Sequence, residues 1–306
     1  MNQDFKTKDL KAELERSLGG GLRLFARLPG RANSLNFIAQ PDSGERFVVK
    51  CVPQERTAEF RRLVMHLNEL DGTAAVRHVH PQALSGFSHY NVVCLSWCEG
   101  VRLFPDRLSR DELRCFLDEY LRFSESLQRT SAVLTPMNPQ VNMRHVQDWF
   151  HGPLADRFKA EIRDMMDPDD LSYRPSALKV IHGDFHHGNF LFVDGRLSGI
   201  FDLEEFRYGY PAEDIVRYFI CASEHLHWFE RLRHRKIREA FAETVRYLPY
   251  PRHEWMVAIN GLHLRMLESR AERGYGPLGT IDLRRKSRLY AAFRRIVEEY
   301  APGGRR

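Results

Sequence analysis

Residues 178–202 constrain the fold of this chain more than any other segment. Three short apolar runs within it have the length and composition of buried strands: residues 178–181, 190–193 and 197–201. The dipeptide Asp194-Gly195 between the last two runs is typical of a hairpin turn. The run His-Gly-Asp-Phe-His-His-Gly-Asn at positions 182–189 joins the first two strands as a polar loop.

Three polar side chains lie at the ends of these predicted strands. Asp184 and Asn189 belong to the loop after the first strand, and Asp202 directly follows the last one. In phosphoryl transfer one carboxylate takes or orients the proton of the attacking hydroxyl, while an amide and a second carboxylate hold Mg²⁺ against the nucleotide phosphates. Asp184 is therefore a candidate catalytic base, and Asn189 and Asp202 are candidate Mg²⁺ ligands.

The first part of the chain has the pattern of a small antiparallel sheet. Apolar alternation and turn residues predict strands and helices as follows: a helix over residues 8–18, strands over 22–26, 35–39 and 46–50, and a helix over 54–70. The turns between the strands contain Pro29-Gly30-Arg31 and Pro41-Asp42-Ser43-Gly44.

Lys50 ends the third predicted strand. A lysine there is commonly just a cation at the end of a strand, but beside the downstream Asp and Asn residues it becomes a candidate clamp on the α- and β-phosphates. Glu59 on the following helix would form an ion pair that positions Lys50, and Glu55 is the competing candidate.

Two further segments are candidates for nucleotide contacts. In the turn over residues 29–34, backbone N–H groups near Gly30 or the hydroxyl of Ser34 would cover phosphate oxygens, although the turn has a single glycine and alone would be an ordinary turn. A buried strand over residues 90–97 then runs into the second part of the chain. Exposed backbone groups at Trp97 and Cys98 would hydrogen-bond adenine at such a hinge.

Beyond this hinge the pattern is mainly helical. Residues 111–128 form an amphipathic helix with Ser109 as N-cap, and residues from 214 to the end are helical with breaks at 249–251 and 274–277. The predicted fold class is α+β with two lobes: a sheet-based, nucleotide-binding lobe over residues 1–97 and a larger helical lobe over 98–306 that carries the catalytic loop, metal site and acceptor site.

Composition places the chain among globular proteins that act in the cytoplasm. Its 306 residues can bury a substantial core, and its apolar runs are much shorter than a membrane span. The N-terminus lacks the apolar region of a secretory signal. The five cysteines are scattered, which favours reduced thiols over disulfides, and Cys94 and Cys98 have no partner pair for zinc.

Positive charge is concentrated in the last third of the chain. The net charge is +5 and the pI is about 9.0, and residues 220–306 contain 18 Lys and Arg against 10 Asp and Glu. Such an excess attracts phosphate, anionic glycan, a membrane surface or nucleic acid. The simpler interpretation is a solvated helical surface, and nucleic acid is disfavoured because no recognised nucleic-acid-binding pattern accompanies the charge.

Taken together, these motifs resemble the aminoglycoside phosphotransferase and choline kinase superfamily, which shares the protein-kinase fold. The resemblance covers about residues 22–215 and rests on the following set: Lys50, Glu59, His182-Gly183-Asp184, Asn189, Asp202 and Tyr208-Gly209-Tyr210-Pro211-Ala212-Glu213-Asp214. Gly183 stands where typical protein kinases have Arg, which favours a small-molecule kinase.

The resemblance implies a role for each matching residue. Asp184 would be the catalytic base, Asn189 and Asp202 the Mg²⁺ ligands, and Lys50 a phosphate-binding residue oriented by Glu59. ATP and Mg²⁺ would be the cofactors, although the loop from Gly30 to Ser34 matches poorly, which leaves ATP and GTP both open. Glu204 would reach a second Mg²⁺ or the substrate, or would simply be solvated.

The expected reaction is transfer of the γ-phosphoryl group to a hydroxyl of a sugar, amino sugar or amino alcohol. Because the C-terminal part is basic, a neutral or anionic acceptor is favoured, and an envelope-glycan kinase is an alternative. A protein Ser/Thr kinase is another, but the stretch between Asp202 and Ala212 is short for an activation segment. The third alternative is a nucleotide-binding module without catalytic activity.

The helix predicted over residues 282–300 leaves a further question open. Its apolar stripe contains Leu289, Phe293, Ile296, Val297 and Tyr300, and its cations are expected largely off the stripe: Arg284, Arg285, Lys286, Arg288, Arg294 and Arg295. Either these cations are solvated while the stripe packs on the lobe, or they recruit an anionic acceptor or make peripheral contact with a membrane surface.

Overall fold

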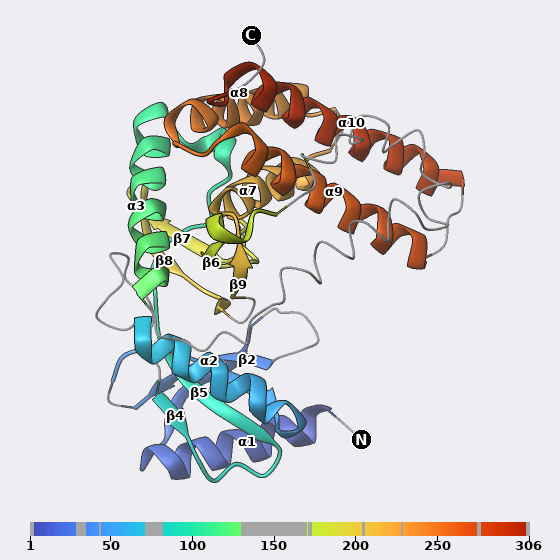
Figure 1. The fold of residues 1–306 in the computed structure, drawn as a ribbon. Coiled ribbons are helices and arrows are strands. Elements are labelled where there is room, and N and C mark those ends of the chain that lie inside the picture. Colours follow the sequence, from blue (N-terminus) through green and yellow to red (C-terminus); the bar gives the residue numbers. More distant parts are fainter. Residues whose placement is uncertain are drawn as a thin grey trace.

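Five strands of the first lobe form one antiparallel sheet in the computed structural model, which describes residues 3–28, 35–42, 44–70, 82–129, 170, 173–203, 206–227, 229–273 and 277–303 (Figure 1). The spatial order is β1-β2-β3-β5-β4, with these bounds: β1 (Leu22–Arg27), β2 (Leu35–Pro41), β3 (Phe47–Pro53), β4 (Gln82–Leu84) and β5 (Tyr90–Ser96). The strands predicted from alternation are present, and the short edge strand β4 was not predicted.

The central strand β3 is covered on both faces. Val49 and Cys51 pack in a core with Leu10 and Leu14 of α1 (Gln3–Leu18), while Val52 on the opposite face packs against α2 (Thr57–Leu70). Successive side chains of a strand point to opposite faces, so Lys50 lies on the α2 face with Val52.

The prediction that Lys50 ends its strand is wrong. β3 continues to Pro53 because Cys51 and Val52 remain buried and pair with Val92 and Asn91 of β5. Lys50 therefore projects from the middle of a strand that is paired on both sides, which is a more rigid position than a strand end.

The second lobe combines two short two-stranded sheets with a set of helices. β6 (Lys179–Ile181) pairs with β9 (Arg207–Gly209), and β7 (Phe190–Val193) pairs with β8 (Arg196–Ile200). The described α-helices of this lobe are α3 (Arg110–Arg129), α7 (Pro211–His225), α8 (Arg231–Tyr247), α9 (Arg252–Arg273) and α10 (Pro277–Tyr300). Three 3₁₀ turns complete the described elements: η1 (Gln54–Arg56), η2 (Pro105–Arg107) and η5 (Pro175–Ala177).

A cluster of buried aromatic rings packs against the loop between β6 and β7. Phe185 of the loop after β6 lies 4.8 Å, between ring centroids, from Phe190 of β7, and Phe190 lies 5.1 Å from Tyr218 of α7. Phe116 of α3 contacts the same rings, and all four side chains are fully buried. Burial of such large side chains fixes the loop to the core.

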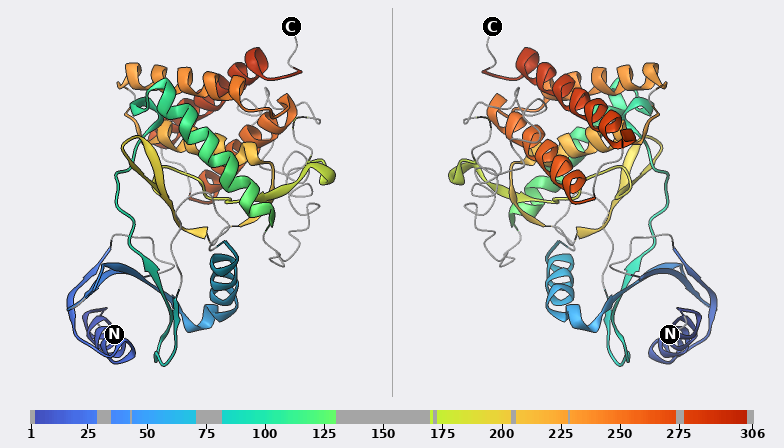
Figure 2. Two further views of the ribbon diagram at one scale, coloured as in Figure 1. Left: turned by 90° about the vertical axis from the view of Figure 1, so that its left-hand side faces the viewer. Right: turned by 90° about the vertical axis from the view of Figure 1, so that its right-hand side faces the viewer.

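The two lobes are joined through the segment after β5. Val101 and Phe192 exchange backbone hydrogen bonds of 2.8 and 2.9 Å, which attaches this segment to the β7–β8 hairpin. Figures 1 and 2 show the sheet lobe and the helical lobe at opposite ends of the molecule. The predicted two-lobed α+β fold is confirmed.

The sequence predicted where some helices begin or end, but not others. Ser109 caps α3 as predicted, since its Oγ accepts from the N–H of Glu112, whose carboxylate accepts in return from the N–H of Ser109. The end of α7 at His225 and the start of α8 at Arg231 were not predicted. Within the described ranges, no helix is long and apolar enough to cross a membrane.

The C-terminal helix departs from its predicted charge pattern most clearly at Arg294. Phe293 and Val297 of the apolar stripe are buried as expected, but Arg294 is also buried. It lies 3.4 Å from Asn260 Oδ1 and 3.2 Å from His263 Nδ1 of α9. Burial and the charge of Arg294 lower the pKa of His263 to about 3, so His263 is neutral at physiological pH. Arg294 is thus a structural cation that ties α10 to α9.

Candidate active site

The backbone of the catalytic loop is held by a buried carboxylate of α7. Asp214 accepts from the N–H of His182 and of Gly183, each at 2.9 Å, one with each carboxylate oxygen. His182 is itself fully buried, and its Nε2 lies 2.8 Å from the carbonyl oxygen of Phe201, next to Asp202. These contacts connect the loop, the start of α7 and the end of β8 into one frame.

Asp184 lies on this frame with both carboxylate oxygens engaged. Asn189 Nδ2 donates to the carbonyl oxygen and to Oδ2 of Asp184, at 2.9 and 3.2 Å. His186 Nε2 lies 3.5 Å from Oδ2, and Arg217 of α7 forms an ion pair with Oδ1. Burial raises the pKa of Asp184, but His186 and Arg217 outweigh it and hold the pKa well below its ordinary value, so the carboxylate is ionised at neutral pH.

Asp202 occupies a different environment at the end of β8. Its Oδ1 accepts from Lys50 Nζ at 2.9 Å, so a side chain of the sheet lobe contacts the carboxylate of the helical lobe. The side chain of Lys50 is 8% exposed, whereas that of Asp202 is 44% exposed. Asp202 also has a φ of +59°, a left-handed conformation that is uncommon outside glycine and frequent at functional sites.

Asn189 and Asp202 are brought together by one short backbone hydrogen bond. The N–H of Phe201 donates to the carbonyl oxygen of Asn189 at 2.7 Å, next to the side chain of Asp202. Because Asn189 Nδ2 donates to Asp184, the amide oxygen is left for another partner.

This donor set suits Mg²⁺, which prefers oxygen ligands and takes few of them from protein. Among the described residues, no group of three or more His, Cys, Asp or Glu is placed to hold a metal without further ligands. Nucleotide phosphates and water would therefore complete the coordination.

The segment between the lobes lies against the same hairpin. Trp97 Nε1 donates to Glu99 at 2.7 Å, and the guanidinium of Arg46 lies 5.7 Å from the Trp97 ring centroid. A Cβ on Gly199 of β8 would come within 2.9 Å of Cys98 Sγ, so the glycine permits this close approach. Cys98 thus lies beside β8, which ends two residues before Asp202, and the proposed contact of Trp97 and Cys98 with adenine stays a prediction.

Four predicted residues are not placed by the structure. Gly30, Ser34 and Glu204 lie outside the described residues. The backbone of Glu59 belongs to α2, but its side chain is not described, so its ion pair with Lys50 stays a prediction.

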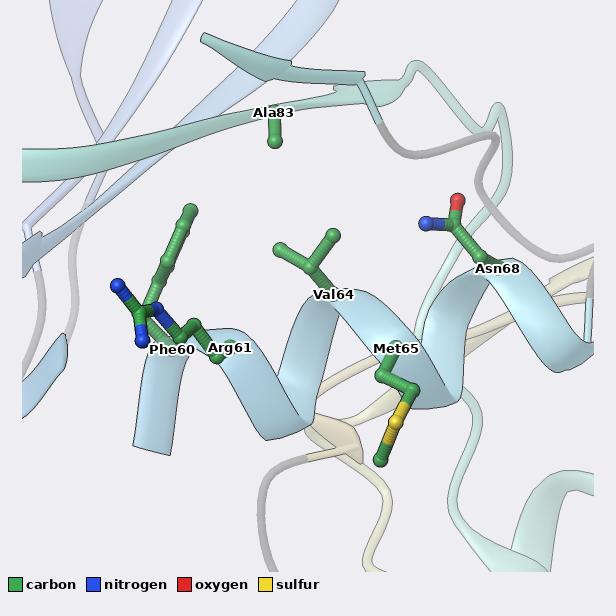
Figure 3. Close-up of a pocket in the computed structure, with 6 residues that line it drawn as sticks. All are labelled: Phe60, Arg61, Val64, Met65, Asn68 and Ala83. Carbon is green, nitrogen blue, oxygen red and sulfur yellow. The ribbon is translucent and has the colours of Figure 1, made fainter. Parts of the chain in front are cut away.

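A separate hollow of about 530 Å³ lies between α2 and the sheet edge (Figure 3). Val64 and Asn68 point from α2 toward the strand that carries Ala83. The remaining lining residues are Phe60, Arg61 and Met65. None of the predicted catalytic or metal-binding residues lines this hollow, so it is distinct from the site around Asp184.

Two residues of the site were not predicted in their observed roles. Asp214 was predicted only as the first residue of a helical region, although it holds the loop backbone. Arg217 follows within the same helix, where nothing in the local sequence distinguishes it from a surface arginine. Only the three-dimensional packing of α7 against the loop brings it to Asp184.

A small strand-rich lobe, a helical lobe and a loop of Asp and Asn residues between them define a phosphotransferase with a protein-kinase-like fold. A sequence model of the phosphotransferase enzyme family matches residues 25–250, so the chain belongs to this family. It is therefore an enzyme, a phosphotransferase with an alcohol group as acceptor, and the resemblance stated from the motifs is confirmed.

Solved structures share the fold at low sequence identity. The ADP-bound aminoglycoside phosphotransferase APH(2'')-Ib is 14% identical, with a TM-score of 0.58, and the match covers 96% of this chain and 99% of that one. A putative aminoglycoside phosphotransferase from Ralstonia eutropha is 15% identical, with a TM-score of 0.59 and coverage of 97% and 99%. Amicoumacin kinase in complex with AMP-PNP, Ca²⁺ and Ami is 11% identical, with a TM-score of 0.56 and coverage of 95% and 96%. No curated protein sequence matches significantly.

Proposed function

We propose that the chain transfers the γ-phosphoryl group of ATP to a hydroxyl of a small molecule in the cytoplasm. The observation that carries this proposal is the convergence of four polar side chains from distant parts of the sequence. Asn189 donates hydrogen bonds to Asp184 on one side of the site, and Lys50 donates a hydrogen bond to Asp202 on the other. The similar structures solved with ADP and with AMP-PNP support a nucleotide as the donor.

In this reaction Asp184 orients the acceptor hydroxyl and takes its proton. The hydroxyl oxygen forms a bond to the γ-phosphorus while the bond from that phosphorus to the bridging oxygen breaks and ADP leaves. The low pKa of Asp184 makes it a weak base, so its main contribution is to orient the hydroxyl in line with the phosphoryl group.

Lys50 would move from Asp202 to the α- and β-phosphates when the nucleotide binds. Asp202 and Asn189 would then hold Mg²⁺, which supplies positive charge at the phosphate oxygens. Glu59 would orient Lys50 from α2, and Glu204 would reach a second Mg²⁺ or the acceptor.

The nucleotide would lie between the lobes, with a boundary at about Trp97. The turn with Gly30 and Ser34 would cover the phosphates, and the backbone at Trp97 and Cys98 would bind adenine. Proximity of Cys98 to β8 supports this placement, because it brings the hinge and the metal-binding end of β8 into one region.

We infer a sugar, amino sugar or amino alcohol as the acceptor, and among these we favour compounds whose net charge is zero or negative. A protein substrate is disfavoured by the segment after Asp202. β9 begins at Arg207 and α7 at Pro211, which leaves little chain for a regulatory activation segment.

ADP release from ATP and Mg²⁺ tests the proposal when it is measured with panels of sugars, sugar acids, amino sugars and amino alcohols. At least one panel should raise ADP release, and Asp184→Asn should abolish the increase while still binding nucleotide. If no panel raises ADP release although the chain binds ATP, the chain is a nucleotide-binding module and the proposal is wrong.

A further inference from the structure

Arg217 occupies the position beside the proposed base where an acceptor should bind. It projects from α7 one turn beyond Asp214, and its Nη2 forms an ion pair with Asp184 Oδ1. Its Nε is buried without a hydrogen-bond partner among the described residues. The guanidinium therefore has hydrogen-bonding capacity that the protein does not use.

This contact competes with the proposed reaction. Oδ2 of Asp184 already faces Asn189 and His186, so Oδ1 is the oxygen that remains for the acceptor hydroxyl. An arginine that stays paired with Oδ1 weakens proton acceptance there and takes the space of the hydroxyl. Turnover thus requires another anion to draw Arg217 away or to share its guanidinium.

A second guanidinium lies in the same region. α9 packs against α7, and Arg265 of α9 has its Nη2 4.0 Å from Glu213 (Figure 1). Glu213 already accepts hydrogen bonds from Arg207 at 2.6 Å and from the N–H of Tyr210 at 2.9 Å. Its carboxylate therefore neutralises the charge of Arg265 only weakly. The side chain of Arg265 is 45% exposed.

The two arginines also act on each other. Although part of the side chain is exposed, the surrounding protein lowers the pKa of Arg265, and the charges of Arg207 and Arg217 lower it further. Tyr290 of α10 is affected by both arginines. Burial raises the pKa of Tyr290, and the positive charges of Arg217 and Arg265 partly oppose this increase. Two neighbouring guanidinium groups repel each other, and an anion that binds both of them stabilises the pair.

We propose that Arg217 and Arg265 form an anion-binding site for the acceptor, so that the acceptor is a hydroxylated carboxylate or phosphate monoester. This inference rests on the proposed kinase function and narrows its acceptor. The anionic group of the acceptor binds the guanidinium of Arg217 in a bidentate manner, as arginine favours. Arg217 then leaves Asp184 Oδ1, which receives the hydroxyl, so the base becomes available only when an acceptor of the right charge is bound.

The test is calorimetric titration of the full chain saturated with AMP-PNP and Mg²⁺, at constant ionic strength. D-Gluconate probes a carboxylate and glycerol 3-phosphate probes a phosphate monoester, with glucose and glycerol as their neutral counterparts. AMP-PNP fills the γ-phosphoryl position, so neither anion can bind there. At least one anion should bind more tightly than its neutral counterpart, and the stronger of the two identifies the class of anion.

Arg217→Gln should weaken binding of that anion at least about tenfold, the usual loss for a hydrogen bond between charged groups. Arg265→Gln, at a half-exposed position, should cause a smaller loss. Arg235→Gln is the matched control, because Arg235 is an exposed arginine of α8 that pairs with Glu239 on its own helix. This control should bind anions as the unmodified chain does.

Three results separate the inference from the proposed function. If AMP-PNP binds but neither anion does, the inference is wrong while the kinase proposal stands. The same holds if both arginine variants bind the anion as tightly as the unmodified chain. If AMP-PNP itself does not bind, the proposed kinase function is wrong and the inference falls with it.

Discussion

Asp184 and Asp202 are both aspartates at the ends of short strands, yet the protein surrounds them differently. The side chain of Asp184 is 13% exposed and contacts Asn189, His186 and Arg217, all from its own lobe. The side chain of Asp202 is 44% exposed, and its described ion pair is with Lys50 of the other lobe.

The difference fits the two chemical tasks that we propose for these residues. A group that orients a hydroxyl must be fixed relative to the reacting atoms, and several contacts around Asp184 provide this. A metal ligand must instead face a cation and the phosphates of a nucleotide, which need open space. Asp202 has a left-handed backbone, which costs on the order of 1 kcal/mol in a residue with a side chain, and its carboxylate contacts Lys50 of the other lobe.

Asp202→Ala should have the largest effect on turnover. The substitution removes the proposed charged metal ligand, so kcat should fall about 10³–10⁴-fold in a coupled ADP-release assay with Mg²⁺. Glu239→Ala, at an exposed carboxylate of α8, serves as a control and should stay within about twofold. Substantial activity of Asp202→Ala, or full activity of the unmodified chain in excess chelator, would contradict the metal-binding role.

Asp184→Asn should lower kcat at least about a hundredfold. The amide keeps the shape of the side chain and one acceptor oxygen, so folding should be preserved, which a thermal melt can check. A variant that retains more than about a tenth of the original kcat would show that Asp184 is not the base.

Asn189→Ala should have a smaller effect than either aspartate substitution. A neutral amide contributes less than a carboxylate to holding a cation, so we expect a loss of about tenfold in kcat and a higher Mg²⁺ concentration for half-maximal rate. Asn189→Asp separates the two roles of this side chain, because it keeps a metal ligand but loses the donor to Asp184. An unchanged Mg²⁺ requirement in Asn189→Ala would exclude it as a ligand.

The smallest expected effect concerns pH. A carboxylate with a lowered pKa stays ionised until the pH falls through that value, so Asp184 should cause no loss of kcat/KM between pH 8 and about 5. Arg217→Gln removes one cause of the lowered pKa and should shift the acid limb upward, toward the ordinary aspartate value of about 4. An acid limb that does not move in this variant would show that Arg217 does not influence Asp184.

Sequence patterns were sufficient for the fold and for the central residues of the site. Strand alternation, the hairpin turn at Asp194-Gly195 and the spacing of Asp184, Asn189 and Asp202 are local features, and each is expressed in short stretches of chain. The structure brings these three side chains and Lys50 into one region as expected. Their chemical roles stay predictions that the variants above test.

Features that depend on tertiary packing could not be predicted. β4 is only a short edge strand, and Arg294 was expected in solvent because its position on α10 resembles that of the neighbouring exposed arginines. Its burial follows from Asn260 and His263 on α9, which offer it polar partners. Arg217 likewise acquires its contact with Asp184 only because α7 packs beneath the catalytic loop.

Nucleotide binding by the two aspartate variants tests the division of roles most directly. Calorimetric titration with AMP-PNP should give nearly the same Kd for Asp184→Asn and the unmodified chain in the presence of Mg²⁺, because in our proposal Asp184 contacts the acceptor and not the phosphates. Asp202→Ala should bind at least about tenfold more weakly in Mg²⁺, and the difference should shrink when Mg²⁺ is left out. Equal weakening by both substitutions, or none by Asp202→Ala, would contradict the assignment of one aspartate to the acceptor and the other to the metal.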